Sequence, residues 1–305
     1  MSPVKPDQGT LLLVDKPAGL TSHDVVQRIR SVLGTRRIGH TGTLDPFATG
    51  LLLLCVGPLT RFAEYFHLLS KTYHATMRLG SETTTDDGTG EVTERSEDWR
   101  LVTEEGVTRA LANRVGPAQQ IPPIYSAKRV DGVRAHERAR AGQTPALQPA
   151  AIVVHSLALS DFKPPEVAFS ARVSTGTYIR ALARDLGRDL GCGAHLTELR
   201  RMTIGPFRVE DAASPDAIEE DAAAPRARRT PSEAVGWLPA RELTEVEEED
   251  VRHGRRIPGS GITPGELDEI SGASAPVALV RGGRLLGVAE PSGTELQPRK
   301  VLVAG

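Results

Sequence analysis

Residues 39–50, GHTGTLDPFATG, contain the side chains best suited to chemistry. With three glycines, one proline and no hydrophobic periodicity, residues 35–50 are predicted to form a loop. Asp45 precedes Pro46, and a residue before proline is kept out of the helical region, so its carboxylate would lie on a stiff, extended turn. The apolar run at residues 51–56 predicts a buried strand directly afterwards. Such a carboxylate is rigidly positioned for catalysis, and the alternative is an aspartate that only caps neighbouring amides.

Hydrophobic spacing predicts the elements before this loop. Residues 10–14 indicate a short strand followed by a turn. Thr21 and Ser22 can supply an N-cap, and apolar residues then recur at helical spacing. Gly34 stands where a helix of this length would end.

The elements after the loop indicate a mixed fold. Strict alternation of apolar and polar residues over 71–79 and 166–174 predicts two half-buried strands. After the second strand, Thr177 can cap a helix that Gly191 would stop. Strands of this kind with interspersed helices predict an α+β fold, in which helices flank a mixed, largely antiparallel sheet.

The last third of the chain differs in composition from the rest. Residues 211–232 are rich in alanine, proline and charge, which favours a mobile segment. Residues 277–280 and 285–289 are apolar and flank Arg-Gly-Gly-Arg, a pattern typical of a hairpin. We therefore predict a first domain at 1–237 and a small β-rich domain at 238–305.

Composition limits the classes of function. The net charge is −2, but residues 211–250 carry twelve acidic and four basic residues, which leaves the rest of the chain at +6. A basic body with an acidic insert is compatible with RNA binding without requiring it. Cys55 and Cys192 stand in unrelated contexts and predict neither a disulfide framework nor a metal site. With no secretory signal and no apolar run long enough to span a membrane, the expectation is a cytoplasmic protein.

Several segments, in order, resemble the bacterial tRNA pseudouridine synthase B family, whose members modify the uridine numbered 55 in the T loop. The resemblance covers residues 10–207. The segments that carry it are GHTGTLDPFATGLL from residue 39, VDKPAGLTS from 14, KTY from 71, LG from 79 with Thr83, Thr85, Asp86 and Gly90, IPPIYSA from 121, GTYIR from 176, HL from 195 and LRR from 199.

The resemblance implies isomerisation of uridine to pseudouridine, with Asp45 as the catalytic carboxylate and with no cofactor and no metal. The reaction breaks the N-glycosidic bond, turns the uracil and rejoins it through C5, so it needs no redox partner. A free aspartate is ionised at neutral pH, since its pKa is about 3.9. The carboxylate could attack the base, attack the sugar or remove a sugar proton, and the sequence does not choose among these routes.

The target uridine must leave its stack to meet the carboxylate, so the resemblance also implies a base pocket. Tyr73 would stack on the extruded base, although its pattern alone fits ordinary core packing. His40 would take the place of the displaced nucleotide, whereas a loop histidine is otherwise a plain surface residue. Tyr178 and Leu199 would line the pocket. Lys16 would support the structure of the site or contact RNA.

Arginines repeat every four residues along the helix predicted after residue 176. Arg180 would be the partner of Asp45, because a buried carboxylate needs a cation or donors and a guanidinium supplies two. Arg184 and Arg188 are interpreted as a solvated stripe. The acids expected to pair with that stripe are Asp185 and Asp189.

The family's RNA contacts would come from an insertion at about residues 117–145 and from a PUA-like domain at 238–305. His136 stands in the insertion where an aromatic residue such as tyrosine is expected. The partner is then tRNA, recognised through its T arm, with no protein partner and no membrane, and the enzyme is expected to be a monomer. Two alternatives stay open: a tRNA-binding chaperone without catalysis, and the catalytic subunit of a guide-RNA-directed particle.

Overall fold

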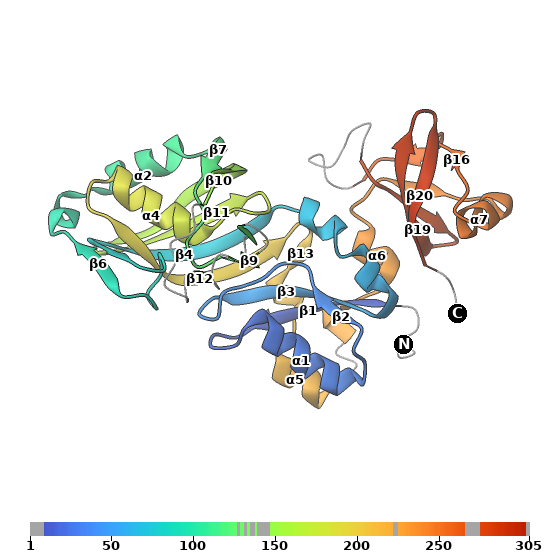
Figure 1. The fold of residues 1–305 in the computed structure, drawn as a ribbon, viewed down its shortest axis with the longest axis horizontal. Helices are drawn as coiled ribbons and strands as arrows, with labels where there is room; N and C mark the ends of the chain where they lie inside the picture. The colour runs from blue at the N-terminus through green and yellow to red at the C-terminus, as the bar shows by residue number, and fades with distance from the viewer. Residues whose placement is uncertain are drawn as a thin grey trace. The chain divides into compact units, whose positions relative to one another are not determined.

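The computed structural model describes residues 9–126, 129–130, 133–134, 138, 147–221, 225–265 and 275–302 (Figure 1). The chain divides into two compact units. Unit 1 comprises Met1–Asp45, Leu51–Leu68 and Pro206–Gly305, and unit 2 comprises Pro46–Gly50 and Leu69–Gly205. Helices and sheets are mixed as expected for an α+β protein. No helix among the described residues is long and apolar enough to cross a membrane.

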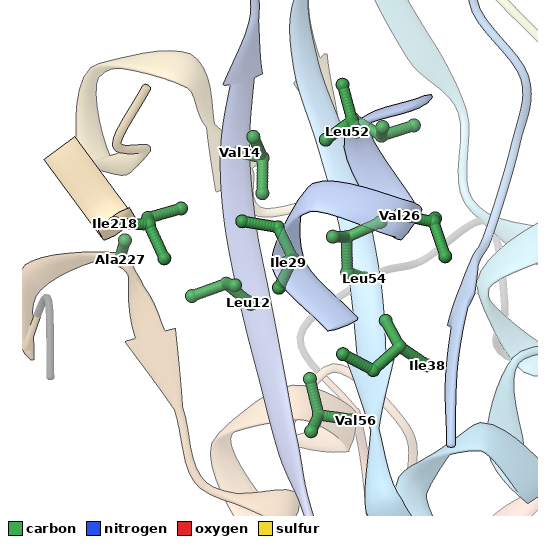
Figure 2. Close-up of a cluster of buried hydrophobic side chains, with 11 residues drawn as sticks. Leu12, Val14, Val26, Ile29, Ile38, Leu52, Leu54, Val56, Ile218 and Ala227 are labelled. Atoms are coloured by element: carbon green, nitrogen blue, oxygen red, sulfur yellow. The ribbon is translucent and has the colours of Figure 1, made fainter. Parts of the chain in front are cut away.

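Unit 1 begins with a strand, a helix and a hairpin. These elements are β1 (Thr10–Lys16), α1 (Ser22–Leu33), β2 (Ile38–His40) and β3 (Thr49–Val56). Helix α1 starts at a capping box between Thr21 and Asp24 and ends at Gly34, whose φ is 60°. Its apolar stripe covers β1 and β3, and Figure 2 shows Ile29 of this stripe between the two strands. Both predicted ends of this helix are confirmed.

Residues 35–50 are not one loop as predicted. Strand β2 pairs antiparallel with β3, with Ile38 opposite Val56 and His40 opposite Leu54. A strand of three residues is too short to show a period, and for this reason the sequence did not reveal it. The loop is confined to residues 41–48 and closes a hairpin.

The prediction of a mobile segment at 211–232 is wrong for the residues described there. Ile218 and Ala227 are buried in the same core as α1 (Figure 2). Ser214 and Thr230 cap two short helices through their hydroxyls. The elements are η5 (Val209–Asp211), α5 (Pro215–Glu220), η6 (Pro225–Ala227), β14 (Arg228–Arg229), which pairs with β1, and α6 (Pro231–Val235). Two apolar anchors and two caps therefore order a segment whose average composition resembles that of a linker.

The sheet of unit 2 has the order β12-β4-β11-β10-β7. Its strands are β4 (Lys71–Leu79), β7 (Gly116–Gln120), β10 (Ala150–Lys163), β11 (Glu166–Val173) and β12 (Ala194–Ile204). All these pairings are antiparallel, and the burial of β4 and β11 alternates as predicted. Thr49 and Gly50, the first residues of β3, pair in parallel with β12.

The remaining elements of unit 2 surround this sheet. Helix α4 (Ile179–Asp189) buries a stripe through Leu182 and Leu186, as predicted. The others are β5 (Ser81–Thr83), β6 (Val92–Arg95), η4 (Asp98–Leu101), α2 (Glu104–Asn113), β8 (Arg129–Val130) and β9 (Val133–Arg134).

Unit 1 also contains a second sheet, formed by the end of the chain. Its order is β16-β20-β19-β18-β15-β17. The predicted hairpin is confirmed: Arg281 pairs with Arg284, and Gly282 and Gly283 have φ of 55° and 75°, the left-handed values that a two-residue hairpin turn requires. The elements are β15 (Ala240–Glu242), α7 (Glu245–Arg252), β16 (Ile257–Pro258), β17 (Ile262–Thr263), β18 (Val277–Arg281), β19 (Arg284–Ser292) and β20 (Glu295–Val301). Unit 1 is completed by η2 (Gly57–Phe62), η3 (Tyr65–Leu68) and β13 (Phe207–Arg208).

Candidate active site

The loop that carries Asp45 is anchored to α1. The Ser22 hydroxyl accepts a hydrogen bond from Leu44 N at 2.8 Å and donates one to Leu44 O at 3.2 Å. Ser22 and Leu44 are 2% and 3% exposed, so these bonds are shielded from water. Asp45, the next residue, is half-buried. The main chain that leads into the candidate catalytic carboxylate is thus fixed to a helix.

The other side of the loop is fixed by a close approach of two strands. Gly50 has a φ of 101°, and a Cβ atom there would lie 2.3 Å from Arg201 O and 2.7 Å from Arg201 N. Only glycine fits, because both obstacles are main-chain atoms and the backbone is left-handed. Five residues after Asp45, the chain is therefore pressed against β12.

Lys16 and His40 flank this loop in the sequence. Lys16 is fully buried, and its ammonium donates to Pro17 O at 2.9 Å and Leu20 O at 2.6 Å. These bonds hold the turn that leads into α1, so of the two predicted roles the geometry favours structural support. His40 is the last residue of β2 and is half-buried, so it is not a fully exposed surface histidine.

Tyr73 and Leu199 come from neighbouring strands of unit 2. Tyr73 on β4 lies opposite Arg201 of β12, and Leu199 lies opposite Ala75. Because no bulge separates these two pairs, Tyr73 and Leu199 lie on the same face of the sheet as diagonal neighbours. Both are largely buried. Two of the residues predicted to contact the base thus share one face of the sheet, which also carries the buried Arg201.

Tyr178 is the N-cap of α4, and the prediction that Thr177 caps this helix is wrong. Tyr178 makes no side-chain capping bond. The amide of Gln120 binds its main chain instead, accepting from Tyr178 N at 2.9 Å and donating to Tyr178 O at 3.1 Å. Gln120 was not singled out by sequence reasoning. Its only signal is its place before Ile121-Pro122, since its partner is 58 residues away.

Arg180 is buried at the start of α4, with an exposure of 4%. It donates to Thr85 O at 2.8 Å and to Tyr125 O at 3.0 Å, and its Nη1 lies 3.4 Å from Asp87 Oδ2. These bonds orient the guanidinium rigidly. The pairing of Arg180 with Asp45 stays a prediction.

The interpretation of Arg184 and Arg188 as a solvated stripe paired with nearby aspartates is right only in part: Arg188 is exposed and Arg184 does bind Asp185, but the acid partners outside the helix were not predicted. Arg184 binds Asp86 Oδ2 at 2.9 Å as well as Asp185. Arg188 grips both oxygens of Glu82, at 2.7 and 2.6 Å, and this lowers the pKa of that carboxyl. Burial raises the pKa of Asp86 despite its arginine. Asp189, the other aspartate predicted to pair with this stripe, pairs with Arg114 instead.

Two family models match consecutive parts of the chain. Residues 30–179 match the TruB family pseudouridylate synthase N-terminal domain, and residues 180–235 match the tRNA pseudouridylate synthase B C-terminal domain. Among solved structures, the chain is similar to one in the crystal structure of a Cbf5-Nop10-Gar1 complex, with 25% identity and a TM-score of 0.75 over 97% of this chain and 86% of that one.

Curated relatives match over almost the whole length. The tRNA pseudouridine synthase B of Thermobifida fusca is 45% identical over 94% of this chain and 96% of its own. The enzyme of that name from Burkholderia mallei is 42% identical over 97% of both chains. These matches confirm the resemblance and the pseudouridine-synthase fold predicted from the motifs. The chain therefore belongs to the tRNA pseudouridine synthase B family.

Proposed function

We propose that this chain isomerises uridine to pseudouridine at position 55 in the T loop of tRNA, with Asp45 as the catalytic carboxylate. The observation that carries this assignment is the anchored loop of a family member: Ser22 fixes Leu44, and Gly50 is pressed against β12. A group that must meet one atom of an extruded nucleotide benefits from such rigidity.

The isomerisation balances without any other reactant. The bond between N1 of uracil and C1′ of ribose breaks, a bond between C5 and C1′ forms, and the proton on C5 is finally replaced by one on N1. An ionised Asp45 can start this sequence by attacking the base, by attacking C1′ or by removing a sugar proton. All three routes use the same carboxylate in the same position.

The proposal also assigns roles to the other predicted residues. Tyr73 stacks on the extruded base, and Leu199 contacts it from the same face of the sheet. Tyr178 borders the pocket from the start of α4, and Arg180 pairs with Asp45. His40 occupies the space that the nucleotide leaves. Lys16 supports the turn before α1.

The remaining RNA contacts come from two regions. The insertion at about residues 117–145 grips the T arm. His136 lies outside the described residues, and so does most of that insertion beyond Ser126. The PUA-like domain at 238–305, which contains the sheet from β15 to β20, adds affinity. In this proposal the enzyme acts on tRNA in the cytoplasm as a monomer, without a protein partner.

Purified protein and unmodified tRNA, without cofactor, guide RNA or second protein, test this proposal. Pseudouridine mapping should show one product, at uridine 55. Asp45→Asn keeps the size and hydrogen bonding of the side chain but removes its charge, so turnover should fall to background while tRNA affinity is retained. Asp161→Asn, at an exposed carboxyl on β10, is the control and should behave like wild type.

The same assay separates the alternatives. A chaperone would refold tRNA without forming pseudouridine, and Asp45→Asn would leave refolding unchanged. A guide-directed subunit would be inactive until guide RNA is added. Pseudouridine formation by Asp45→Asn at a rate near wild type would remove Asp45 from the mechanism.

A further inference from the structure

The side-chain amide of Gln120 holds both main-chain polar groups of a single residue, Tyr178. Its Oε1 accepts from Tyr178 N at 2.9 Å, and its Nε2 donates to Tyr178 O at 3.1 Å. Gln120 is the last residue of β7 and is only 4% exposed. Tyr178 O also accepts from Leu182 N at 3.1 Å, so Gln120 adds a second donor to this carbonyl and supplies the acceptor for Tyr178 N. The pairing fixes the orientation of one peptide plane on each side of Tyr178.

This position controls how α4 begins. Tyr178 is the N-cap and makes no side-chain capping bond of its own. Its carbonyl accepts the first helical bond, from Leu182 N, and Gln120 binds this same residue from the side, at the point where the helix begins. Tyr178 and Arg180 both project from this first turn. A change in the backbone angles of the N-cap would therefore turn the Tyr178 side chain and displace it from the base pocket to which the proposed function assigns it.

Helix α4 holds the residues after Gln120 at two more points. Arg184 donates to Ile121 O at 3.1 Å, and Arg180 donates to Tyr125 O at 3.0 Å. Residues 120–125 are therefore tied along the helix by side chains from both partners. This segment lies near the start of the insertion that we assign to RNA contacts.

We propose that Gln120 is a positioning residue for pseudouridine formation, which acts by fixing the main chain of Tyr178. This inference rests on the proposed function, in which Tyr178 borders the base pocket. Gln120 itself does not touch the substrate. Its contribution lies in the chemical step, after the nucleotide has entered the pocket, because a misplaced Tyr178 allows the base to bind in poses that do not react.

Three variants test the role of Gln120. Gln120→Leu keeps nearly the same shape and loses both bonds. Gln120→Glu keeps the acceptor for Tyr178 N but places an oxygen against Tyr178 O. Gln27→Leu, which removes an exposed glutamine amide on α1, outside the proposed RNA contacts, is the matched control. Single-turnover rates with saturating enzyme report the chemical step, filter binding reports tRNA affinity, and thermal unfolding reports stability.

We expect both Gln120 variants to lower the single-turnover rate at least about tenfold, while the dissociation constant for tRNA stays within about threefold of wild type. The Gln27 control should match wild type in both. A purely structural role would lower the unfolding temperature but leave the single-turnover rate of the folded enzyme unchanged, and that result would overturn the inference. A loss confined to tRNA affinity would also overturn it.

A double-mutant cycle with Tyr178→Ala tests the route of the effect. If Gln120 acts through Tyr178, adding Gln120→Leu to Tyr178→Ala should change the rate by less than about twofold. Fully additive losses would show that Gln120 acts elsewhere. Failure here is distinct from failure of the proposed function, because wild type would still form pseudouridine and Asp45→Asn would not.

Discussion

A single hydroxyl, that of Ser22, satisfies both the amide and the carbonyl of Leu44. The bond crosses from the first residue of α1 to the residue before Asp45. Because Thr21 and Asp24 cap the same helix, the anchor is itself held in place. The main chain at Leu44 is therefore fixed to the helix, although 22 residues separate the two bonded groups in the chain.

Ser22→Ala should disturb this loop. It leaves two buried main-chain groups of Leu44 without their partner, which costs about 1–3 kcal/mol of stability. Since the freed peptide precedes Asp45, kcat should fall more than stability alone explains. Ser31→Ala, which removes an exposed hydroxyl bound to Gln27 O on the same helix, is the control. Urea unfolding and steady-state kinetics measure both effects, and equal kcat in the two variants would contradict this role.

Gly50→Ala should be far more damaging than Gly39→Ala. At Gly50 the new methyl group meets the main chain of Arg201, and the left-handed backbone adds strain. At Gly39 a Cβ atom meets nothing within 4 Å. We expect a loss of at least about 3 kcal/mol for the first variant and less than about 1 kcal/mol for the second. Similar unfolding midpoints for the two would show that β3 and β12 are not in close contact.

Because of Lys71, the free energy of unfolding should depend on pH in the alkaline range. It is buried at the start of β4 and donates to Leu69 O, and burial, with a smaller contribution from Arg201, lowers its pKa to about 8 from 10.5. Between those values the unfolded chain retains a proton that the folded chain has lost, so stability rises with pH. Below about pH 8 both states hold the proton and the penalty of burial is fully present.

Lys71→Met isolates this effect. From pH 8 to 10.5 the wild type should gain stability relative to the variant, by up to about 1.4 kcal/mol per pH unit. Lys163→Met, at an exposed lysine, should show no such relative change. Urea titrations at both pH values provide the measurement. A wild-type-to-variant difference that is flat across this window would mean that Lys71 keeps its proton in the folded state.

The C-terminal sheet should contribute affinity and not chemistry, because every proposed site residue precedes residue 202. The place of truncation matters. Trp237 is buried, donates to Ala234 O and packs edge-on against Phe66 at 6.2 Å. A chain ending at Leu238 should therefore keep kcat and show a raised KM for tRNA. A chain ending at Val235 loses this indole and should unfold at a lower temperature. A folded but inactive Leu238 truncation would contradict this division of roles.

The sequence predicts helices and strands well where the hydrophobic residues of an element follow a single regular spacing. Alternation over β4 works because each strand faces the core with every second residue. The capping box and Gly34 mark α1 for the same local reason. The motif around Asp45 locates the catalytic loop, but the strand β2 before it is too short to leave a pattern.

Contacts between distant segments escape this kind of reasoning. Glu82 is the partner of Arg188, yet 106 residues separate them, and the nearer aspartates suggested a different pairing. Gln120 looks like any polar residue at the end of a strand until Tyr178 is placed beside it. Ile218 is an isolated apolar residue in a charged segment, and only the position of α5 reveals that it belongs to the core (Figure 2).

The three arginines of α4 meet three acids in reverse order of sequence. Arg180 lies near Asp87, Arg184 binds Asp86 and Arg188 binds Glu82. Substitutions in the helix and in residues 82–87 should therefore be coupled during evolution. A substitution of one partner alone leaves the other charge unpaired. Homologues that lack one of these arginines should therefore differ at the facing acid as well.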